Sequence, residues 1–331
     1  LTIRLCLKLK ISTIYSVCDQ EAAQKIYQKL IKNGVKLKTS LTGYINLNRK
    51  QNQYDYDKRD IWISYRARNL SDKFGWLGRK AHEKAKIAKI KDYLKNHDLN
   101  VDISTREEDR VYGKDWDNLL KRSKATLITI SGASVCDFTG EIQKNYEKAF
   151  DSGNNKIFLK KIYEPYDGKI IATMISPRVF EAALNKVFMI GYEDHYSKIL
   201  KPNIHYFVLK RDHSNLDEVI CILKNKKLVT KFVNRVYKDL ILSEKYTWQK
   251  FIIDFEINEN FSNPSFGKTE KLNLIFKILF IDFRVFRKLF ILYLKNNKNV
   301  IVNLIKISLI FLLPRKIKNN LKKINDNYFK L

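Results

Sequence analysis

Glycine and proline are scarce in this 331-residue sequence, with 11 and 5 residues. That scarcity argues against a collagen-like or low-complexity chain. Cysteine is rarer still, with four scattered residues at positions 6, 18, 136 and 221. They form no C-x-x-C pair and have no histidine at metal-ligand spacing. The pattern argues against a disulfide framework and a cysteine-based zinc site, and it favours reduced cysteines in a cytosolic chain.

Acidic residues are few relative to basic ones, at 35 against 63, and the formal net charge is +28. A charge of that size points to an anionic partner: phosphate esters, nucleic acid or an acidic membrane surface. No helix-turn-helix, RNP-type or zinc-finger pattern is present, so no specific nucleic-acid partner is expected.

The chain has room for roughly two domains of about 150 residues each. With 45% hydrophobic and 12% aromatic residues it can form a core. Strands alternate with helices after a polar linker at 51–60. Strands are expected at 60–66, 99–103, 125–131, 186–192 and 205–209, and helices at 79–96, 114–124, 177–185, 216–224, 227–242 and 246–257. This alternation predicts an α/β fold with a doubly wound parallel sheet, whose ligands bind at the carboxyl ends of the strands.

A capped helix start is the most informative local feature. Ser176 is a good N-cap and Pro177 suits the first helical position. The helix would then present free N–H groups to an anion, with Arg178 adding a bidentate donor. Glu181, one turn on, can accept hydrogen bonds from sugar hydroxyls. An ordinary capped helix with a solvated glutamate is the alternative.

A basic, glycine-containing loop follows the first expected strand. It carries Arg66 and Arg68, then Gly75 and Gly78, whose missing side chains allow close approach to a phosphate. The spacing is neither a Rossmann fingerprint nor a P-loop, and a basic surface loop is the alternative. The histidines, including His195, have no carboxylate at metal-ligand spacing. Because G-x-S-x-G is also absent, they are interpreted as structural or surface residues.

The order of several motifs resembles the nucleotide-sugar-binding half of a group 1 glycosyltransferase, near the CgeB-like branch. The resemblance covers about residues 55–255. Its motifs are Tyr65-Arg-Ala-Arg68, Asp102-Ile-Ser104, Asp109-Arg-Val-Tyr-Gly113, Ser131-Gly-Ala-Ser-Val135, Ser176-Pro-Arg178 and Phe180-Glu-Ala182. The resemblance implies a GT-B architecture, in which this half is a Rossmann-like donor lobe facing an acceptor lobe across a cleft.

The same resemblance implies roles for particular residues. Glu181 would engage the ribose of the donor nucleotide, and Arg66, Arg68 and Lys84 would bind its diphosphate. Arg178 and Ser176 would border that pocket. Neither a metal nor another cofactor is implied, because cationic side chains neutralise the departing diphosphate in such enzymes.

These features predict three parts: 1–54 as a remnant of the N-terminal acceptor lobe and a linker, 55–262 as the donor-binding domain, and 263–331 as a basic helical tail. The expected activity is transfer of a sugar from a nucleotide sugar to a surface-glycan or lipid-linked acceptor. Only about 60 residues precede the donor-lobe strand, whereas a domain-sized lobe needs on the order of 100–200. An inactive, truncated glycosyltransferase is therefore one alternative. A non-catalytic cationic α/β protein that binds nucleic acid or anionic membrane is another.

The tail contains 15 basic and 3 acidic residues from Lys268 to Leu331, among many Phe, Leu and Ile. On a helical projection of 273–295 the basic residues fall within a stripe about 100° wide, and nearly all the rest is apolar. This pattern is typical of a helix in a membrane interface. Residues 272–318 are therefore expected to bind an anionic membrane surface, which places the protein in the cytoplasm at the inner face of the cell membrane. Packing on the globular domain or on a partner is the alternative.

Overall fold

A computed structural model describes residues 2–46 and 55–259 of the chain. The chain divides into two compact units, Leu1–Glu259 and Asn260–Leu331. The predicted basic helices of the tail lie outside the described residues.

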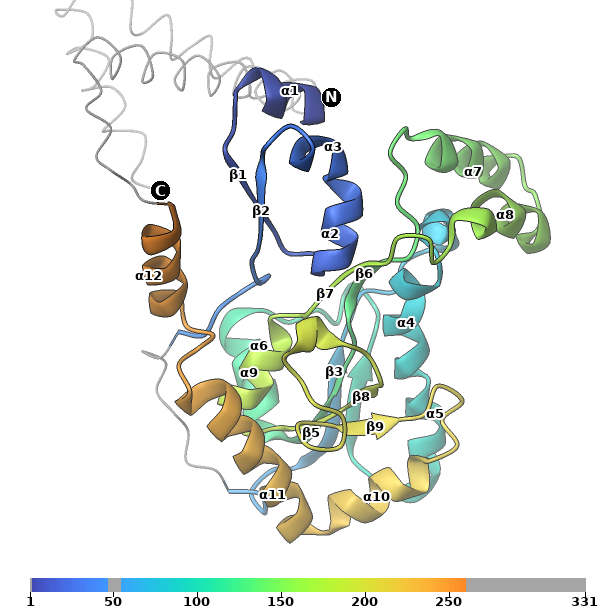
Figure 1. The fold of residues 1–331 in the computed structure, drawn as a ribbon. Helices are drawn as coiled ribbons and strands as arrows, with labels where there is room; N and C mark the ends of the chain where they lie inside the picture. Colours follow the sequence, from blue (N-terminus) through green and yellow to red (C-terminus); the bar gives the residue numbers. More distant parts are fainter. Residues whose placement is uncertain (1, 47–54, 260–331) are drawn as a thin grey trace, which may run out of the picture. The chain divides into compact units, whose positions relative to one another are not determined.

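The first 46 residues form a small α/β unit above the main sheet (Figure 1). Its strands β1 (Thr13–Ser16) and β2 (Lys36–Thr39) pair in parallel, with Thr13 opposite Lys36. The connection between them holds α2 (Gln20–Ile26) and α3 (Gln28–Ile31), and α1 (Thr2–Lys8) precedes β1. The two helices are separated at Tyr27, whose ψ of 12° departs from helical values.

The main sheet has five strands, all parallel, in the order β4-β3-β5-β8-β9. They are β3 (Ile61–Arg66), β4 (Val101–Ser104), β5 (Ser123–Ile128), β8 (Phe188–Tyr192) and β9 (Phe207–Leu209). The expected α/β class with a parallel sheet is confirmed. Because the chain moves from β3 outward to β4 and then back to β5, the topological switch point lies between β3 and β5, where ligands of such sheets bind.

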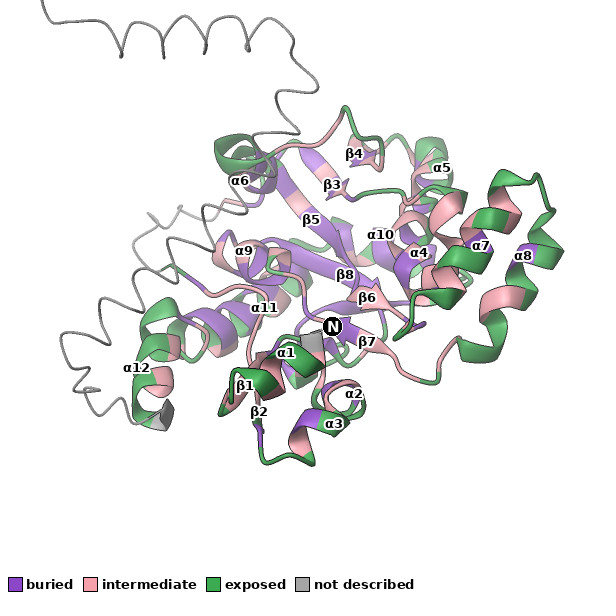
Figure 2. Cartoon of the chain, turned by 90° about the horizontal axis from the view of Figure 1, so that it is seen from above, coloured by how far each residue is buried: buried purple, intermediate pink, exposed green. Residues whose placement is uncertain are grey.

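Helices cover both faces of this sheet, and the strands between them are largely buried (Figure 2). One core cluster joins the sheet to α6 (Gly113–Arg122), α9 (Arg178–Leu184) and the π-helix at Tyr237–Leu242. The other joins it to α4 (Arg79–Ala88), α5 (Ile90–Leu94), α10 (Leu216–Lys224) and α11 (Lys226–Val236). The inner strand β8, whose five residues are all buried, shows the apolar character that parallel strands have when helices cover both faces.

An excursion between β5 and α9 was not foreseen from the sequence. β6 (Ser131–Ala133) pairs antiparallel with β7 (Ala172–Met174), and between them lie α7 (Glu141–Asp151) and α8 (Lys156–Tyr163). The two helices lie side by side, away from the central sheet, in both views (Figures 1 and 2).

The last described helix, α12 (Trp248–Glu259), returns to the N-terminal unit. The ring of Phe251 lies 4.6 Å from that of Tyr44, and the ring of Phe255 lies 5.2 Å from that of Tyr15. The first and last described segments therefore stabilise each other. Among the residues that the structure describes, no helix is long and apolar enough to cross a membrane.

Candidate functional site

A cleft of about 1220 Å³ separates the small N-terminal unit from the carboxyl edge of the main sheet. Its walls come from β1, β2 and the start of α2 on one side, and from α4, α12 and the loops around β7 and β8 on the other. Four carboxylates and six lysines line the cleft, and the lysines are at positions 25, 38, 80, 169, 198 and 245. The cleft is thus large enough for a ligand of several groups and carries an excess of positive charge.

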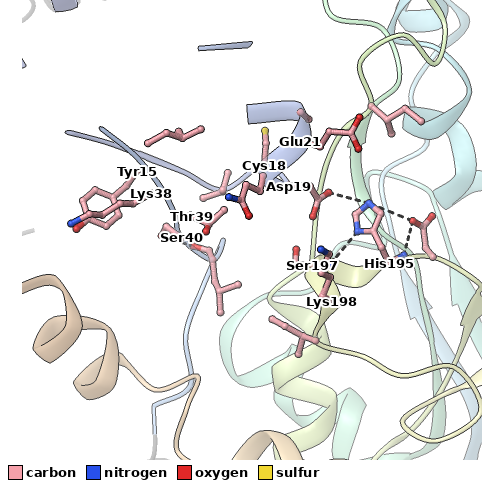
Figure 3. Close-up of a pocket in the computed structure, with 18 of the residues that line it drawn as sticks. Tyr15, Cys18, Asp19, Glu21, Lys38, Thr39, Ser40, His195, Ser197 and Lys198 are labelled. Carbon is pink, nitrogen blue, oxygen red and sulfur yellow. Dashed lines mark hydrogen bonds and ion pairs between the residues drawn. The ribbon is translucent and has the colours of Figure 1, made fainter. Parts of the chain in front are cut away.

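A carboxylate and an imidazole meet across this cleft (Figure 3). Asp19 precedes α2 in the N-terminal unit, and its Oδ2 lies 3.0 Å from Nε2 of His195, which follows β8. The hydroxyl of Thr173 donates to the same Oδ2 at 3.0 Å, and the backbone N–H of Asp19 donates to the Thr173 carbonyl at 3.1 Å. Burial is the main cause that raises the pKa of Asp19.

The residue before His195 belongs to a network of ion pairs. Asp194, the neighbour of His195, pairs with Lys80 of α4, and both side chains are nearly buried, with exposed fractions of 8% and 12%. Lys80 also pairs with Glu83 at 3.3 Å, and Glu83 binds Arg211 beyond β9. The network fixes the loop that carries His195 to two neighbouring parts of the main domain.

The turn after His195 has an unusual backbone. Tyr196, Ser197 and Lys198 have φ angles of 38°, 53° and 59°, in the left-handed region that non-glycine residues rarely adopt. Each such residue costs on the order of 1–3 kcal/mol, and residues of this kind cluster at functional sites. Here the turn directs the backbone N–H of Ser197 to Nδ1 of His195, at 3.3 Å.

A second group of polar residues surrounds Arg178 at the start of α9. The guanidinium of Arg178 lies 4.9 Å from the ring centre of Trp116, and it donates a hydrogen bond to the carbonyl of Arg66 at the end of β3. The Trp116 indole N–H donates to Oε2 of Glu181 at 2.7 Å. Two of the residues predicted to bind the donor, Arg178 and Glu181, are thus brought together around one aromatic ring.

Lys84 belongs to the same group. It is half-buried on α4, and burial, followed by the nearby charge of Arg178, lowers its pKa. Burial also lowers the pKa of Arg178. Within the described part of the chain, neither residue forms an ion pair, although the charge of Glu181 acts to raise the pKa of Arg178. Two partly desolvated cations thus lie close enough for their charges to interact.

The other two predicted arginines are placed differently. Arg66 binds the carboxylate of Asp102 at 2.7 Å and donates to the carbonyls of Asp102, Tyr65 and Asp109, so its guanidinium holds the loop after β4. Arg68 is exposed and lies 4.0 Å from Glu107. Their roles at a diphosphate stay predictions.

The helix start and the glycines also differ in detail from expectation. The structure begins α9 at Arg178 with Pro177 as the N-cap residue, one position later than expected, and Ser176 Oγ accepts from the Arg178 N–H at 3.4 Å. A Cβ at Gly75 would lie 2.1 Å from the Tyr146 hydroxyl, and one at Gly78 would lie 2.6 Å from Ser134 Oγ. Both glycines therefore make room for side chains of this same chain.

The cleft and the Arg178 group are connected through α4 and α9. Lys80 lines the cleft and Lys84 follows four residues later, so both lie on one face of α4 about 5–6 Å apart at Cβ. On the other side, the Thr42 hydroxyl donates to the Ile175 carbonyl just before the Ser176 motif. The two groups of polar residues thus belong to neighbouring parts of one edge of the sheet.

The sequence analysis did not single out Asp19, and its interpretation of His195 as a structural or surface residue stays a prediction. The two residues are 176 positions apart, so no local spacing could have linked them. Across residues 2–46 and 55–259, no group of three or more histidine, cysteine, aspartate or glutamate side chains is arranged to hold a metal ion.

No family model matches the sequence, and no curated protein does. Several solved structures are similar to the fold. A mutant of TarM from S. aureus, solved with fondaparinux, α-GlcNAc-glycerol and UDP, has a TM-score of 0.44 and 11% identity over 75% of this chain and 43% of its own. The pneumococcal O-GlcNAc transferase GtfA, solved with UDP and GlcNAc, has a TM-score of 0.35 and 10% identity over 77% of this chain and 46% of its own. The chain spans less than half the length of these structures.

Proposed function

We propose that this chain is a glycosyltransferase that binds a nucleotide sugar and transfers the sugar to a surface-glycan or lipid-linked acceptor. The observation that carries the proposal is the pair Lys84 and Arg178, two half-buried cations whose charges interact and that form no ion pair within the described residues. Leaving buried charges without a counterion is costly, so the arrangement favours an anionic ligand. A diphosphate offers adjacent negative groups for an ammonium and a planar guanidinium.

The residues around this pair fit the rest of a nucleotide sugar. Glu181 keeps Oε2 on the Trp116 indole, which leaves its other oxygen for a ribose hydroxyl. The sequence resemblance to the CgeB-like branch of group 1 glycosyltransferases supports the same role for Glu181. The neighbouring cleft, at about 1220 Å³, has room for a sugar and an acceptor.

The test is ligand-dependent thermal stabilisation. UDP is the first probe, since two of the similar structures were solved with it, followed by GDP, ADP and a panel of UDP- and GDP-hexoses. A bound ligand raises the melting temperature increasingly with its concentration. Lys84→Ala and Arg178→Ala should each weaken binding by about 10–100-fold, since each removes a charge-assisted contact worth about 1.5–3 kcal/mol.

Lys86→Ala is the matched control, because Lys86 is exposed on the same helix. It should bind like the unaltered chain. Absence of stabilisation by every nucleotide, or equal losses in the control, contradicts the proposal. Stabilisation by oligonucleotides or anionic lipid alone favours the non-catalytic cationic protein. Nucleotide binding without transfer favours the inactive, truncated enzyme.

A further inference from the structure

We propose that the acceptor of the transfer is an acidic glycan, a saccharide chain that carries carboxylate or phosphate groups, and that it binds in the cleft between the N-terminal unit and the main sheet. The inference rests on the proposed function and adds to it the chemical class of the acceptor. The charge that stays unpaired on the walls of this cleft, together with the aromatic rings beside it, supports this assignment.

The acidic residues of the cleft do not balance its lysines. Each of the four carboxylates has a basic side chain at ion-pair distance: Lys25 for Glu21, Lys80 for Asp194, Lys250 for Asp254 and His195 for Asp19. Three further lysines of the lining, Lys169, Lys198 and Lys245, form no ion pair within the described residues. Three ammonium groups therefore lie around one cavity without a carboxylate, and such a concave surface concentrates anions.

The backbone that carries Lys198 is strained and firmly held. Lys198 is the last of three consecutive residues in the left-handed region, with a φ of 59°. Tyr196 is buried and its hydroxyl donates to the Tyr192 carbonyl at 3.0 Å, while Ser197 Oγ accepts from the Ile175 N–H at 3.2 Å. Lys198 itself is exposed and lines the cleft (Figure 3). Because such strained residues cluster at ligand-binding sites, we assign this lysine to ligand binding.

The other two lysines also come from anchored turns. Lys169 follows Gly168, whose N–H donates to a carbonyl of the loop after β6 at 2.7 Å. Lys245 precedes Tyr246, whose carbonyl accepts from the Ile45 N–H at 2.7 Å, where the N-terminal unit meets the main domain. Three separate segments thus hold a lysine at one cleft, and charges on a backbone that is already fixed lose less entropy when a ligand binds.

Aromatic rings supply the apolar part of the lining. Tyr44 lies 4.6 Å from Phe251 and Tyr15 lies 5.2 Å from Phe255 between ring centres, and all four residues line the cleft and are half-buried. The ammonium of Lys38 lies 5.9 Å from the centre of the Tyr15 ring. The C–H faces of sugar rings pack well on aromatic rings, and charged groups then fix the orientation of the ligand. This combination fits a saccharide that carries negative groups.

The cleft adjoins the proposed donor site along α4. Lys80 lines the cleft, and Lys84 follows one turn later beside Arg178. A glycan in the cleft can therefore present a hydroxyl to a sugar whose diphosphate lies at Lys84 and Arg178. In the transfer, the hydroxyl oxygen forms a bond to the anomeric carbon, and the bond from that carbon to the diphosphate oxygen breaks. The electron pair of the broken bond leaves with the diphosphate, and the hydroxyl proton ends in the solvent.

The experiment is calorimetric titration of the full chain with two pairs of glycans that differ only in charge. One pair is tetragalacturonic acid and its methyl ester, and the other is mannopentaose 6-phosphate and mannopentaose. In one pair or both, the acid should bind more tightly than its neutral partner by about tenfold or more, and added salt should narrow the difference. The pair that responds tells a carboxylate ligand from a phosphate ligand. Joint replacement of Lys169, Lys198 and Lys245 by Gln should weaken binding of that acid by about tenfold, since an exposed ion pair contributes up to about fivefold.

A second triple variant is the matched control for net charge. Joint replacement of Lys161, Lys227 and Lys231 by Gln removes the same charge from exposed positions outside the cleft, and it should leave the affinity for the acids unchanged. Equal losses in the two variants, or equal affinities of acid and neutral glycan in both pairs, overturn the proposal. An RNA pentanucleotide that binds more tightly than either acid, and that loses as much affinity in the cleft variant, also overturns it.

The transfer reaction gives a further readout, and the failures of the two proposals are distinguishable. With a UDP- or GDP-hexose as donor, the cleft variant should raise the KM of the acidic acceptor by about tenfold and leave the KM of the donor unchanged. An unchanged acceptor KM overturns the assignment of the cleft. A chain that UDP or GDP stabilises but that binds neither acid overturns the acidic acceptor and leaves the proposed function intact. A chain that binds an acid but no nucleotide overturns the proposed function, and with it the role of the cleft as an acceptor site.

Discussion

The indole N–H of Trp116 donates a hydrogen bond to Oε2 of Glu181 at 2.7 Å, which ties α6 to α9 in the ligand-free chain. Trp116 is buried, with an exposed fraction of 8%, and its ring also faces Arg178. Glu181 is therefore not the solvated residue of an ordinary capped helix, and ligand binding is not the only role open to its carboxylate. It satisfies a buried donor and keeps a second oxygen for a hydroxyl.

This double role gives the first prediction. Glu181→Ala leaves the Trp116 N–H without an acceptor, which costs about 1–3 kcal/mol, so the ligand-free melting temperature should fall by about 3–8 °C. Glu181→Gln keeps an amide oxygen for the indole and should melt within about 2 °C of the unaltered chain. Scanning calorimetry of both variants, with and without UDP, makes the measurement.

The two variants separate packing from ligand binding. Both should lose UDP-dependent stabilisation, because neither presents a carboxylate to the ribose. If Glu181→Ala melts at the same temperature as the unaltered chain, the hydrogen bond from Trp116 to Glu181 does not contribute to the stability of the fold. If Glu181→Gln keeps full stabilisation by UDP, the carboxylate does not bind the nucleotide.

The central sheet was predictable because most of its strands are short runs rich in apolar residues. Segments such as 186–192 are buried on both faces in a parallel sheet, so hydrophobicity alone marks them. The excursion at 131–174 was not predictable in the same way. Its helices α7 and α8 bury only Tyr146 and Leu159 between them, so the sequence there has almost no core-facing signal.

The candidate site was predictable only where its residues are close in sequence. Arg178 and Glu181 fall on one helix turn, and spacing brings them together. Asp19 and His195 meet only through the way the N-terminal unit docks on the main domain, a contact with no local signature. Arg66 was recognised as a candidate, but its partners, Asp102 in β4 and Asp109 in the loop after it, follow from strand order, which spacing does not reveal.

The docking of α12 on the N-terminal unit gives a second prediction. Phe251 lies 4.6 Å from Tyr44, so Phe251→Ala should remove about 1–2 kcal/mol of apolar contact. Amide hydrogen exchange in β1 and β2 should then accelerate by roughly tenfold. Ile253→Ala is the control, since Ile253 is 51% exposed on the same helix and should leave exchange unchanged. Equal exchange in Phe251→Ala and the unaltered chain contradicts this docking.

A third prediction concerns stability against pH. Burial first, and then the charge of Lys86, lowers the pKa of His213 below 6.5, and its Nε2 lies 2.6 Å from the Tyr192 hydroxyl. The unfolded chain therefore binds a proton more readily, so this contribution is present above pH 6.5 and is lost as the pH falls from 6.5 through the lowered pKa. The melting temperature should decline over that range.

The variant that tests this prediction is His213→Asn. Position 213 has a φ of 63°, a conformation that asparagine tolerates, so the substitution removes the titration with little backbone strain. The decline in melting temperature below pH 6.5 should flatten in this variant and persist in His97→Asn, a change to another histidine. An identical decline in His213→Asn and the unaltered chain contradicts the assignment.

The last prediction concerns the basic tail, for which membrane binding stays a proposal from sequence. A narrow basic stripe beside a wide apolar face matches an anionic lipid surface, which offers an apolar boundary and countercharge worth about 1 kcal/mol per basic residue. The full chain should therefore bind vesicles of phosphatidylserine and phosphatidylcholine, and salt should weaken the binding. A chain ending at residue 262 should not sediment with these vesicles, and vesicles of pure phosphatidylcholine should bind the full chain only weakly.

Replacing Arg284, Arg287 and Lys288 by Gln should weaken binding of the full chain to the anionic vesicles by about 100-fold or more, at that energy per charge. Equal sedimentation of the shortened and full chains would place the membrane contact elsewhere in the protein.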